Sequence, residues 1–392
     1  MLAVLAPGQG AQTPGMLAPW LDDADIAAAL RWSAAVTGID LVALGTTGSA
    51  EEIRDTAVAQ PLLVALALAV ADRLLDDTRQ PVVAGHSVGE FAAAAMAGAL
   101  TPETALTLVR ERGRLMAAAS ATTPTGMSAV LGGDAAEVAA ALERHGLTAA
   151  NVNTAGQVVA AGRIEALAAL AADPPARARI RALEVAGAFH TEFMASARDG
   201  LAVVAASAPR TDPTRMLLGN GDGAVVQAGD DVVRRLVEQV ARPVRWDLCM
   251  ATLADLGVTG VIELAPSGTL TGLVRRAMPG VETLAISTPD DVPAARAMLD
   301  RHTVATSEPA PSWRVAVAPV AGTFRRTDAE PGTTLRPGAA LGVVVSNRAE
   351  SSVEAVHGGV LVEWLAYDGD PVSPGQALAR LHPLDADAAV YA

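Results

Sequence analysis

The sequence predicts an α/β protein that has a smaller inserted α/β subdomain and a C-terminal all-β sandwich. Residues 1 to about 120 alternate short apolar strands with Ala-rich helical patterns, which is typical of an α/β sheet. Residues 126–185 follow the order β-α-β-β-α-β, which favours a ferredoxin-like insertion. The residues beyond 312 contain an internal repeat, and two paired copies of a short β-unit favour a small quasi-symmetric sandwich.

The large domain is expected to be discontinuous. Leu2–Leu5 and Val82–Ala84 are its first predicted strands, and each runs into a glycine-containing loop. The α/β alternation resumes after the insertion, with strands predicted at Met216–Gly219, Val261–Leu264 and Leu284–Ile286. Since sites in open α/β sheets form where loops leave the carboxyl ends of strands, the two glycine loops are expected to meet.

The insertion has its own alternation of strands and helices. Strands are predicted at Met127–Leu131, Val158–Ala161 and Ala182–Val185, and helices at Ala135–His145 and Ile164–Ala172. The predicted boundaries are therefore residues 1–125 and 189–300 for the large domain and 126–188 for the insertion.

A Pro- and Ser-containing linker is predicted at residues 301–312, followed by the β domain at 313–384. The repeat in that domain has an offset of 37 residues, as Gly332 and Gly369 illustrate. Three segments match their counterparts: Ala318–Gly322 with Ala355–Gly359, Gly332 with Gly369, and Leu335–Leu341 with Val372–Leu378.

Composition bounds the function and the compartment. The 392 residues carry a formal charge of −14 and no basic run, which argues against nucleic-acid binding. All 29 basic residues are Arg, so chemistry that needs a lysine amine is excluded. The apolar run Leu62–Ala71 is too short to cross a bilayer and favours a buried helix. Cys249 is the single cysteine and the N-terminus lacks a basic start, so we expect a cytoplasmic protein without a membrane partner.

A Gly-x-Ser-x-Gly pattern lies between Val82–Ala84 and a predicted helix at Phe91–Leu100. At a strand-to-helix junction this pattern is a nucleophile elbow, in which the glycines permit a tight turn that exposes the Ser87 hydroxyl. The backbone N–H groups that follow the serine begin the helix, where they can stabilise an oxyanion.

A serine nucleophile needs a base within hydrogen-bond reach. Of the six histidines, His86 adjoins Ser87 but should point away from it on a tight turn, and His145 ends a polar helix. His302, His357 and His382 lie in or beyond the linker. The remaining one, His190, lies where the insertion returns to the large domain and is the best candidate, although a buried structural histidine would give the same pattern.

The motifs together resemble those of the malonyl-CoA:acyl carrier protein transacylases and of the related acyltransferase domains of polyketide synthases. The resemblance covers about residues 1–290. It rests on these segments, in this order: Pro7–Gln12, Gly85–Glu90, Arg112–Met116, Asn151–Asn153, Gly156–Val159, Ala188–His190, Pro243–Trp246, Glu263–Pro266 and Leu270–Leu273. That family has an α/β-hydrolase-like fold with a ferredoxin-like insertion.

The resemblance implies a role for each matching residue. Ser87 would form a covalent acyl-enzyme, and His190 would take and return the proton. The backbone carbonyl of Gln239 would orient the histidine, in place of an Asp. The backbone N–H groups of Gln9 and Val88 would form the oxyanion hole. The reaction implied is ping-pong transfer from malonyl-CoA to the thiol of acyl carrier protein, for fatty acid or polyketide synthesis.

Arg112 would set the specificity. Malonyl differs from acetyl by one carboxylate, which a planar guanidinium can bind through two hydrogen bonds. By its sequence context alone, Arg110–Arg114 is a charged run that is typical of a solvated helix. Val88 and Ala188–His190 resemble the malonyl-selecting forms of the family.

The C-terminal repeat resembles biotinyl/lipoyl carrier domains. In those domains a modified lysine lies at a hairpin tip between the halves, and the matching position here is Arg348. An arginine cannot form the amide bond to biotin or lipoate, so we expect neither adduct and no other cofactor. A docking, positioning or oligomerising role is expected, with an inert relic as the alternative.

Two other functions share some of these features. A serine hydrolase has the same Gly-x-Ser-x-Gly pattern, but it usually places its histidine near the end of the domain and carries a His-Gly-Gly type loop. A non-catalytic scaffold is suggested only by the carrier-like tail. Since acyl carrier proteins are usually acidic, a local basic patch is also expected, at Arg177, Arg179 and Arg181 or at Arg275 and Arg276.

Overall fold

The computed structural model describes residues 1–76, 79–302, 314–346, 349–356 and 358–382. The chain divides into two units, residues 1–305 and 306–392, which we describe separately. The predicted boundary between them is slightly wrong, because the last helix of the first unit runs to His302. Most of the predicted linker, residues 303–312, lies outside the described residues.

A six-stranded sheet forms the centre of the first unit. Its order is β11 (Glu282–Ala285), β10 (Gly260–Glu263), β1 (Leu2–Ala6), β2 (Val82–Gly85), β7 (Leu217–Leu218) and β8 (Val225–Val226). The pairs are parallel except for the β7–β8 pair. Strands from both ends of this unit's sequence share the sheet, so the chain leaves the sheet after β2 and returns at β7.

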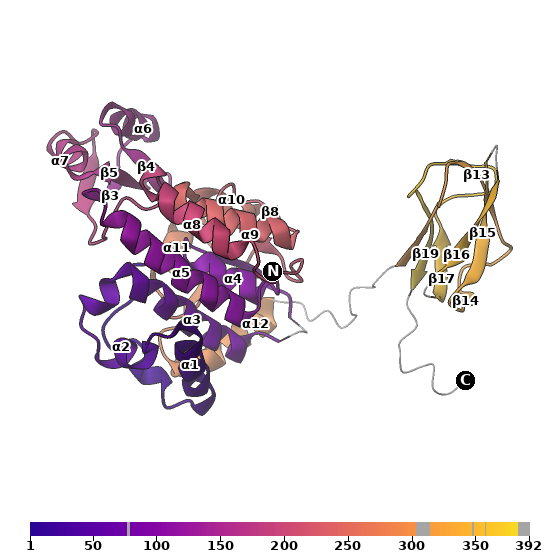
Figure 1. Cartoon of the computed structure of the whole chain (residues 1–392), viewed down its shortest axis with the longest axis horizontal. Helices are drawn as coiled ribbons and strands as arrows, with labels where there is room; N and C mark the ends of the chain where they lie inside the picture. Colours follow the sequence, from indigo (N-terminus) through magenta and orange to yellow (C-terminus); the bar gives the residue numbers. More distant parts are fainter. Residues whose placement is uncertain (77–78, 303–313, 347–348, 357, 383–392) are drawn as a thin grey trace. The chain divides into compact units, whose positions relative to one another are not determined.

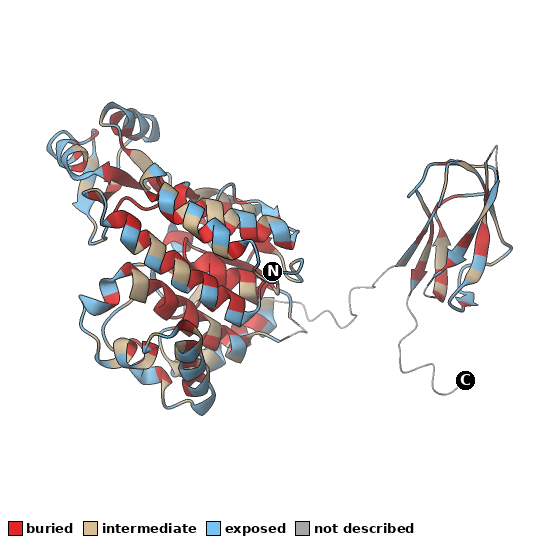
Figure 2. Ribbon diagram, in the orientation of Figure 1, coloured by how far each residue is buried: buried red, intermediate tan, exposed pale blue. Residues whose placement is uncertain are grey.

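Helices cover both faces of this sheet (Figures 1 and 2). In β1, Leu2 and Val4 face one hydrophobic core, whereas Ala3 and Leu5 face the other, as expected for a strand buried on both sides. The first core is formed with α1 (Ala24–Thr37), α2 (Leu41–Thr47), α3 (Thr56–Leu74), α4 (Gly89–Met96), α5 (Pro102–Ser120), α8 (Ala195–Ala205), α9 (Gly229–Glu238) and α12 (Val292–His302). The second is formed with α10 (Trp246–Asp255) and α11 (Thr269–Ala277).

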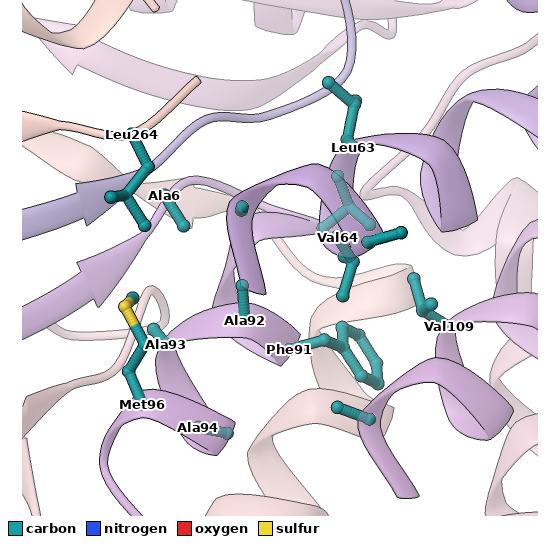
Figure 3. Packing of buried hydrophobic residues seen from close by; sticks show 14 of the residues in the cluster. Ala6, Leu63, Val64, Phe91, Ala92, Ala93, Ala94, Met96, Val109 and Leu264 are labelled. Carbon is teal, nitrogen blue, oxygen red and sulfur yellow. The ribbon is translucent and has the colours of Figure 1, made fainter. Parts of the chain in front are cut away.

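The helices around the elbow are packed through apolar side chains. Figure 3 shows Leu63 and Val64 of α3, Phe91 of α4 and Val109 of α5 in one cluster. The predicted helix Phe91–Leu100 is displaced, since α4 begins at Gly89 and ends at Met96. A positive φ at Gly98 ends the helical conformation there.

Helix α3 contains the apolar run Leu62–Ala71 and confirms that it is a buried helix. Among the described residues it is the one single helix long and apolar enough to cross a membrane by length and composition, and 72% of its most apolar window is buried in the fold. The bent pair α1–α2 passes the same test only if it is counted as one span. A core helix of a globular protein has these properties as well.

A second, five-stranded sheet is formed by the insertion and one later strand. Its order is β6 (Ala178–Ala182), β3 (Thr125–Gly132), β5 (Gln157–Arg163), β4 (Thr148–Thr154) and β9 (Val244–Arg245). Helices α6 (Ala135–Arg144) and α7 (Ile164–Ala172) pack against one face. The parallel pairing of β9 with β4 joins the insertion to the segment that follows α9.

The last predicted strand of the insertion, Ala182–Val185, is wrong: β6 instead spans Ala178–Ala182. The alternation Arg-Ile-Arg places Ile180 against the apolar side of the sheet and the arginines on the opposite side. The apolar residues Leu183 and Val185, which suggested the strand, leave the sheet and pack against the larger core.

The register of the five-stranded sheet determines on which face Arg181 of β6 lies. Arg181 lies opposite Ala129 of β3, and Ala129 lies opposite Val159 of β5. Directly paired residues of antiparallel strands project from the same face. Arg181 therefore lies on the face that carries Ala129 and Val159, at the edge of the sheet.

The second unit consists of two four-stranded antiparallel sheets around one apolar core. The first has the order β12 (Arg314–Val317), β19 (Ala377–His382), β17 (Gly359–Trp364) and β14 (Thr334–Leu335). The other has the order β16 (Glu350–Ala355), β15 (Ala339–Val345), β13 (Gly322–Arg326) and β18 (Pro371–Val372). The repeat matches β14 with β18. Each of these strands pairs with a strand from the other half of the repeat, β14 with β17 and β18 with β13, so the two halves exchange one strand each.

Candidate active site

The nucleophile elbow connects β2 to α4 and places Ser87 in a left-handed conformation, with φ 54°. The turn brings backbone atoms so close together that side chains are excluded at two of its positions. A Cβ added at Gly85 would lie 2.0 Å from the Gly89 carbonyl group, and one at Gly89 would lie 2.4 Å from the Ala6 carbonyl oxygen. Both glycines of the pattern are therefore required by the close packing of β1, β2 and α4.

His190 lies against the serine, as predicted. Its Nε2 is 2.7 Å from the Ser87 Oγ, and its Nδ1 is 2.7 Å from the Gln239 backbone oxygen. A carbonyl oxygen only accepts hydrogen bonds, so Nδ1 carries the proton and Nε2 accepts from the serine hydroxyl. Burial, together with the charge of Arg112, lowers the pKa of His190 to about 3. The imidazole is thus neutral and able to accept a proton.

Arg112 extends from α5 into the same site and is 1% exposed. Its two terminal nitrogens donate to Gln60 Oε1 and Gln239 Oε1, each at 2.7 Å, and Nη2 lies 3.3 Å from the Ser87 Oγ. The guanidinium also lies over the Phe91 ring, 5.8 Å from its centroid. Burial lowers the pKa of Arg112 to about 10, so the side chain remains charged at neutral pH. Arg112 is not on a solvated face.

Two polar side chains that the sequence patterns did not indicate, those of Asn220 and Glu90, support the backbone of the elbow. The Oδ1 of Asn220 accepts from the Ser87 N–H at 2.7 Å, and its Nδ2 donates to the Gly85 oxygen at 2.8 Å. The carboxylate of Glu90, itself 5% exposed, accepts from the Asn220 N–H at 2.7 Å. Burial raises the pKa of Glu90 to about 7.

The cleft above these groups has a volume of about 230 Å³. It is lined from the first glycine loop, the elbow, the insertion and α11, by residues that include Gly8–Ala11, Ser87, Arg112, Met127, Ala129, Val159, His190, Leu270 and Leu273. The two glycine loops therefore meet, as predicted. Gln9 lines the cleft, and Val88, wholly buried, is the N-cap residue of α4 directly after Ser87.

His86 does not serve Ser87, and instead connects the elbow to the insertion. Its Nε2 is 2.9 Å from Asn153 Oδ1 on β4, and its ring packs edge-on against Trp246. Burial lowers its pKa, so the ring is held neutral. The motif Asn151–Asn153 thus has a structural partner that sequence spacing did not indicate.

The arrangement contains the parts needed for acyl transfer. A serine with a neutral, oriented base can attack a carbonyl carbon, and a buried cation beside the nucleophile can bind a carboxylate on the same substrate. Gln60 and Glu90 were missed, although each is a polar residue within or beside an apolar helical run. That placement is the one sequence signal that could have indicated them.

Comparison with known proteins places this site in a family. The model of the acyl transferase domain matches residues 4–304. The malonyl CoA-acyl carrier protein transacylase of Mycobacterium tuberculosis is 54% identical over 299 residues, which cover 74% of this chain and 98% of the relative. The Escherichia coli protein of the same name is 33% identical over 302 residues, with 75% and 98% covered.

Solved structures agree with the sequence comparison. The crystal structure of the M. tuberculosis enzyme aligns with a TM-score of 0.74 and 51% identity, covering 76% of this chain and 99% of that one. A malonyl-transacylase in complex with a type II polyketide synthase acyl-carrier protein aligns with a TM-score of 0.71 and 30% identity, covering 76% and 99%. The β unit beyond residue 304 lies outside the family match. The chain belongs to the acyl transferase domain family, alongside the malonyl CoA-acyl carrier protein transacylases.

Proposed function

We propose that this protein is an acyl-carrier-protein S-malonyltransferase, which moves the malonyl group of malonyl-CoA to the phosphopantetheine thiol of acyl carrier protein. The observation that carries the proposal is the Arg112 guanidinium, buried 3.3 Å from the Ser87 Oγ. The relatives named above support the same reaction. The product would supply fatty acid or polyketide synthesis.

In the first half-reaction Ser87 Oγ attacks the thioester carbon while His190 Nε2 takes the hydroxyl proton. The negative charge that develops on the thioester oxygen is stabilised by the backbone N–H groups of Gln9 and Val88. Collapse of the tetrahedral intermediate breaks the carbon–sulfur bond, and His190 returns its proton to the departing coenzyme A thiol. A malonyl ester on Ser87 remains.

In the second half-reaction the same groups act in reverse. His190 takes the proton of the phosphopantetheine thiol, whose sulfur attacks the ester carbon of the malonyl-Ser87 intermediate. When the ester bond breaks, His190 gives the proton back to the Ser87 oxygen. The mechanism is ping-pong because coenzyme A leaves before the carrier protein reacts.

Arg112 selects malonyl by binding its free carboxylate. Gln60 and Gln239 hold the guanidinium through neutral oxygens, so its charge stays available for an anionic substrate. Acetyl would leave the buried cation without an anionic partner, which disfavours its reaction. A hydrolase mechanism would give this buried charge no purpose.

For the fold, we propose an α/β-hydrolase-like domain with a ferredoxin-like insertion. The parallel sheet with a strand-to-helix nucleophile elbow supports the former. The order β6-β3-β5-β4 and the two helices on one face support the latter. The buried thiol of Cys249 fits a reducing compartment, and we propose a cytoplasmic location.

The acidic carrier protein is proposed to dock along the β6 edge of the cleft. Arg177, Arg179 and Arg181 are exposed, and within the described ranges no ion pair involves them. At the opposite rim, Arg276 donates to Gln157 at 3.2 Å, and Gln157 lines the cleft. Arg181 shares a sheet face with the cleft-lining Ala129 and Val159, and Arg276 contacts the cleft-lining Gln157, which supports both patches as candidates for binding the phosphate of a pantetheine arm.

We propose that the C-terminal unit is a biotinyl/lipoyl-like domain that carries no biotin or lipoate. Two four-stranded sheets that exchange β14 and β18 support the first part. The second part rests on Arg348, which lies outside the described residues. A docking or positioning role remains our proposal for this unit.

Ser87→Ala should abolish the malonyl-enzyme, because the attacking oxygen is removed. Intact-mass measurement after incubation with malonyl-CoA checks this, with the exposed Ser196→Ala as the matched control. A malonyl adduct that persists in Ser87→Ala would refute the nucleophile assignment.

Arg112→Ala should lower kcat/KM for malonyl-CoA by about a hundredfold or more, and acetyl transfer should rise relative to it. Competition between the two thioesters measures the preference, and circular dichroism checks the fold. Arg114→Ala, an exposed neighbour paired with Glu111, is the control. An unchanged preference for malonyl would remove Arg112 from the substrate pocket.

Arg181→Glu should slow transfer to the carrier protein about tenfold at low salt, because steering by rim charges is lost. Formation of the malonyl-enzyme from malonyl-CoA is measured separately. Arg198→Glu, on α8 and paired with Asp199, is the control. Equal carrier rates for both variants would contradict docking at β6.

The protein purified from its native host should carry no biotin or lipoate at Arg348, because an arginine at the matching position cannot be acylated by either group. Peptide mass spectrometry across residues 340–360 checks the site directly. Any biotin or lipoate adduct would overturn this proposal.

A further inference from the structure

A buried carboxylate beside the active site is not used by the reaction proposed above. Glu90 lies in the first turn of α4, three residues after Ser87, and is 5% exposed. It accepts hydrogen bonds from the Asn220 N–H and from Gln239 Nε2. Burying a carboxylate is costly, and these two donors offset part of that cost.

Gln239 is the residue through which Glu90 reaches the substrate pocket. Its Nε2 donates to the Glu90 carboxylate and, at 2.9 Å, to the Ser87 backbone oxygen. Its Oε1 accepts from Arg112 Nη2 at 2.7 Å. The backbone oxygen of the same residue binds His190.

The direction of this amide is determined by its neighbours. An ionised carboxylate and a main-chain carbonyl accept hydrogen bonds but donate none, so both require the NH₂ end of Gln239 on their side. The amide oxygen must then face Arg112. The reversed amide would place two donors against each other at Arg112 and an oxygen against two acceptors at Glu90 and Ser87.

We propose that Glu90 is a positioning residue that fixes the direction of the Gln239 amide and thereby holds Arg112 in place for the substrate carboxylate. The proposal rests on the function proposed above, in which Arg112 binds the malonyl group. Glu90 acts through Gln239, and its charge adds to the favourable potential at the guanidinium.

Glu90→Gln removes the contribution of Glu90 to the direction of the amide without changing the size of the side chain. Glutamine can donate as well as accept, so a reversed Gln239 amide also finds a partner at position 90, and only the Ser87 carbonyl and Arg112 still oppose the reversal. Its oxygen can still accept from the Asn220 N–H, which keeps the elbow supported. The variant should therefore loosen Arg112 while the serine chemistry is retained.

The experiment compares wild type and Glu90→Gln at pH 8, above the raised pKa of about 7 for Glu90. We expect KM for malonyl-CoA to rise about tenfold with kcat changed less than about threefold, and acetyl transfer to stay the same. Glu90→Asp, which keeps a group that only accepts, should retain more of the malonyl preference than Glu90→Gln.

A double-mutant cycle with Gln239→Leu tests the route of the effect. Gln239→Leu keeps the backbone oxygen for His190 but removes the amide, so it should raise the malonyl KM as Glu90→Gln does. The double variant should be no worse than Gln239→Leu alone. If Glu90→Gln does not fold, the cycle is measured with Glu90→Asp, whose smaller effect should also vanish in the Gln239→Leu background.

An unchanged malonyl preference in Glu90→Gln, an equal loss of malonyl and acetyl transfer, or additive effects in the cycle would overturn the proposal. Arg112→Ala is measured alongside, so that failure of the proposed role of Glu90 can be distinguished from failure of the proposed function. If Arg112→Ala keeps its malonyl preference, the proposed function fails. If Arg112→Ala loses the preference and Glu90→Gln keeps it, only the role of Glu90 fails.

Discussion

A charged guanidinium buried beside the nucleophile is the constraint that organises this site. Arg112 is 1% exposed, and the groups that bind its terminal nitrogens are the amide oxygens of Gln60 and Gln239. These acceptors are neutral and hold the two terminal nitrogens, whereas Nε has no hydrogen-bond partner among the described residues. No carboxylate in the described part of the chain is hydrogen-bonded to the guanidinium, and Glu90 acts on its charge only from beyond Gln239. The site is therefore more stable with an anion present, and a substrate carboxylate supplies it.

The same constraint explains the unusual partner of the base. A carboxylate beside His190 Nδ1 would raise the pKa of the histidine and would also compete for Arg112. The Gln239 carbonyl oxygen orients the ring at 2.7 Å without either effect. Arg112 and burial together hold the pKa of His190 near 3, so the base is neutral before the substrate arrives. One residue, Gln239, thus serves the base with its backbone and the cation with its side chain.

The residues themselves indicated Ser87 and His190, whereas Arg112 and the carbonyl of Gln239 were predicted from the resemblance to a known family, and the structure brings all four together. Ser87 lies in a recognisable local pattern, whereas the run Arg110–Arg114 by itself predicted a solvated helix, which the burial of Arg112 contradicts. The supporting residues Gln60, Glu90 and Asn220 were not predicted, because they are defined by which buried groups need a partner. That depends on contacts between segments as far apart as Glu90 and Asn220. The edge strand β6 was also misplaced. Arginines occupy one of its faces, so the sequence lacks the continuous apolar run that suggested a strand at Ala182–Val185.

The short strand β9 has a mechanical consequence for the cleft. It follows the Gln239–Ala241 turn almost directly and pairs with β4, while Asn153 of β4 binds His86 next to the nucleophile. A hinge motion of the insertion would therefore pull on the elbow and on the anchor of the base at once. Such an opening would disturb the positions of Ser87 and His190. We therefore expect a pantetheine arm to reach Ser87 through the existing cleft, without movement of the insertion as a body.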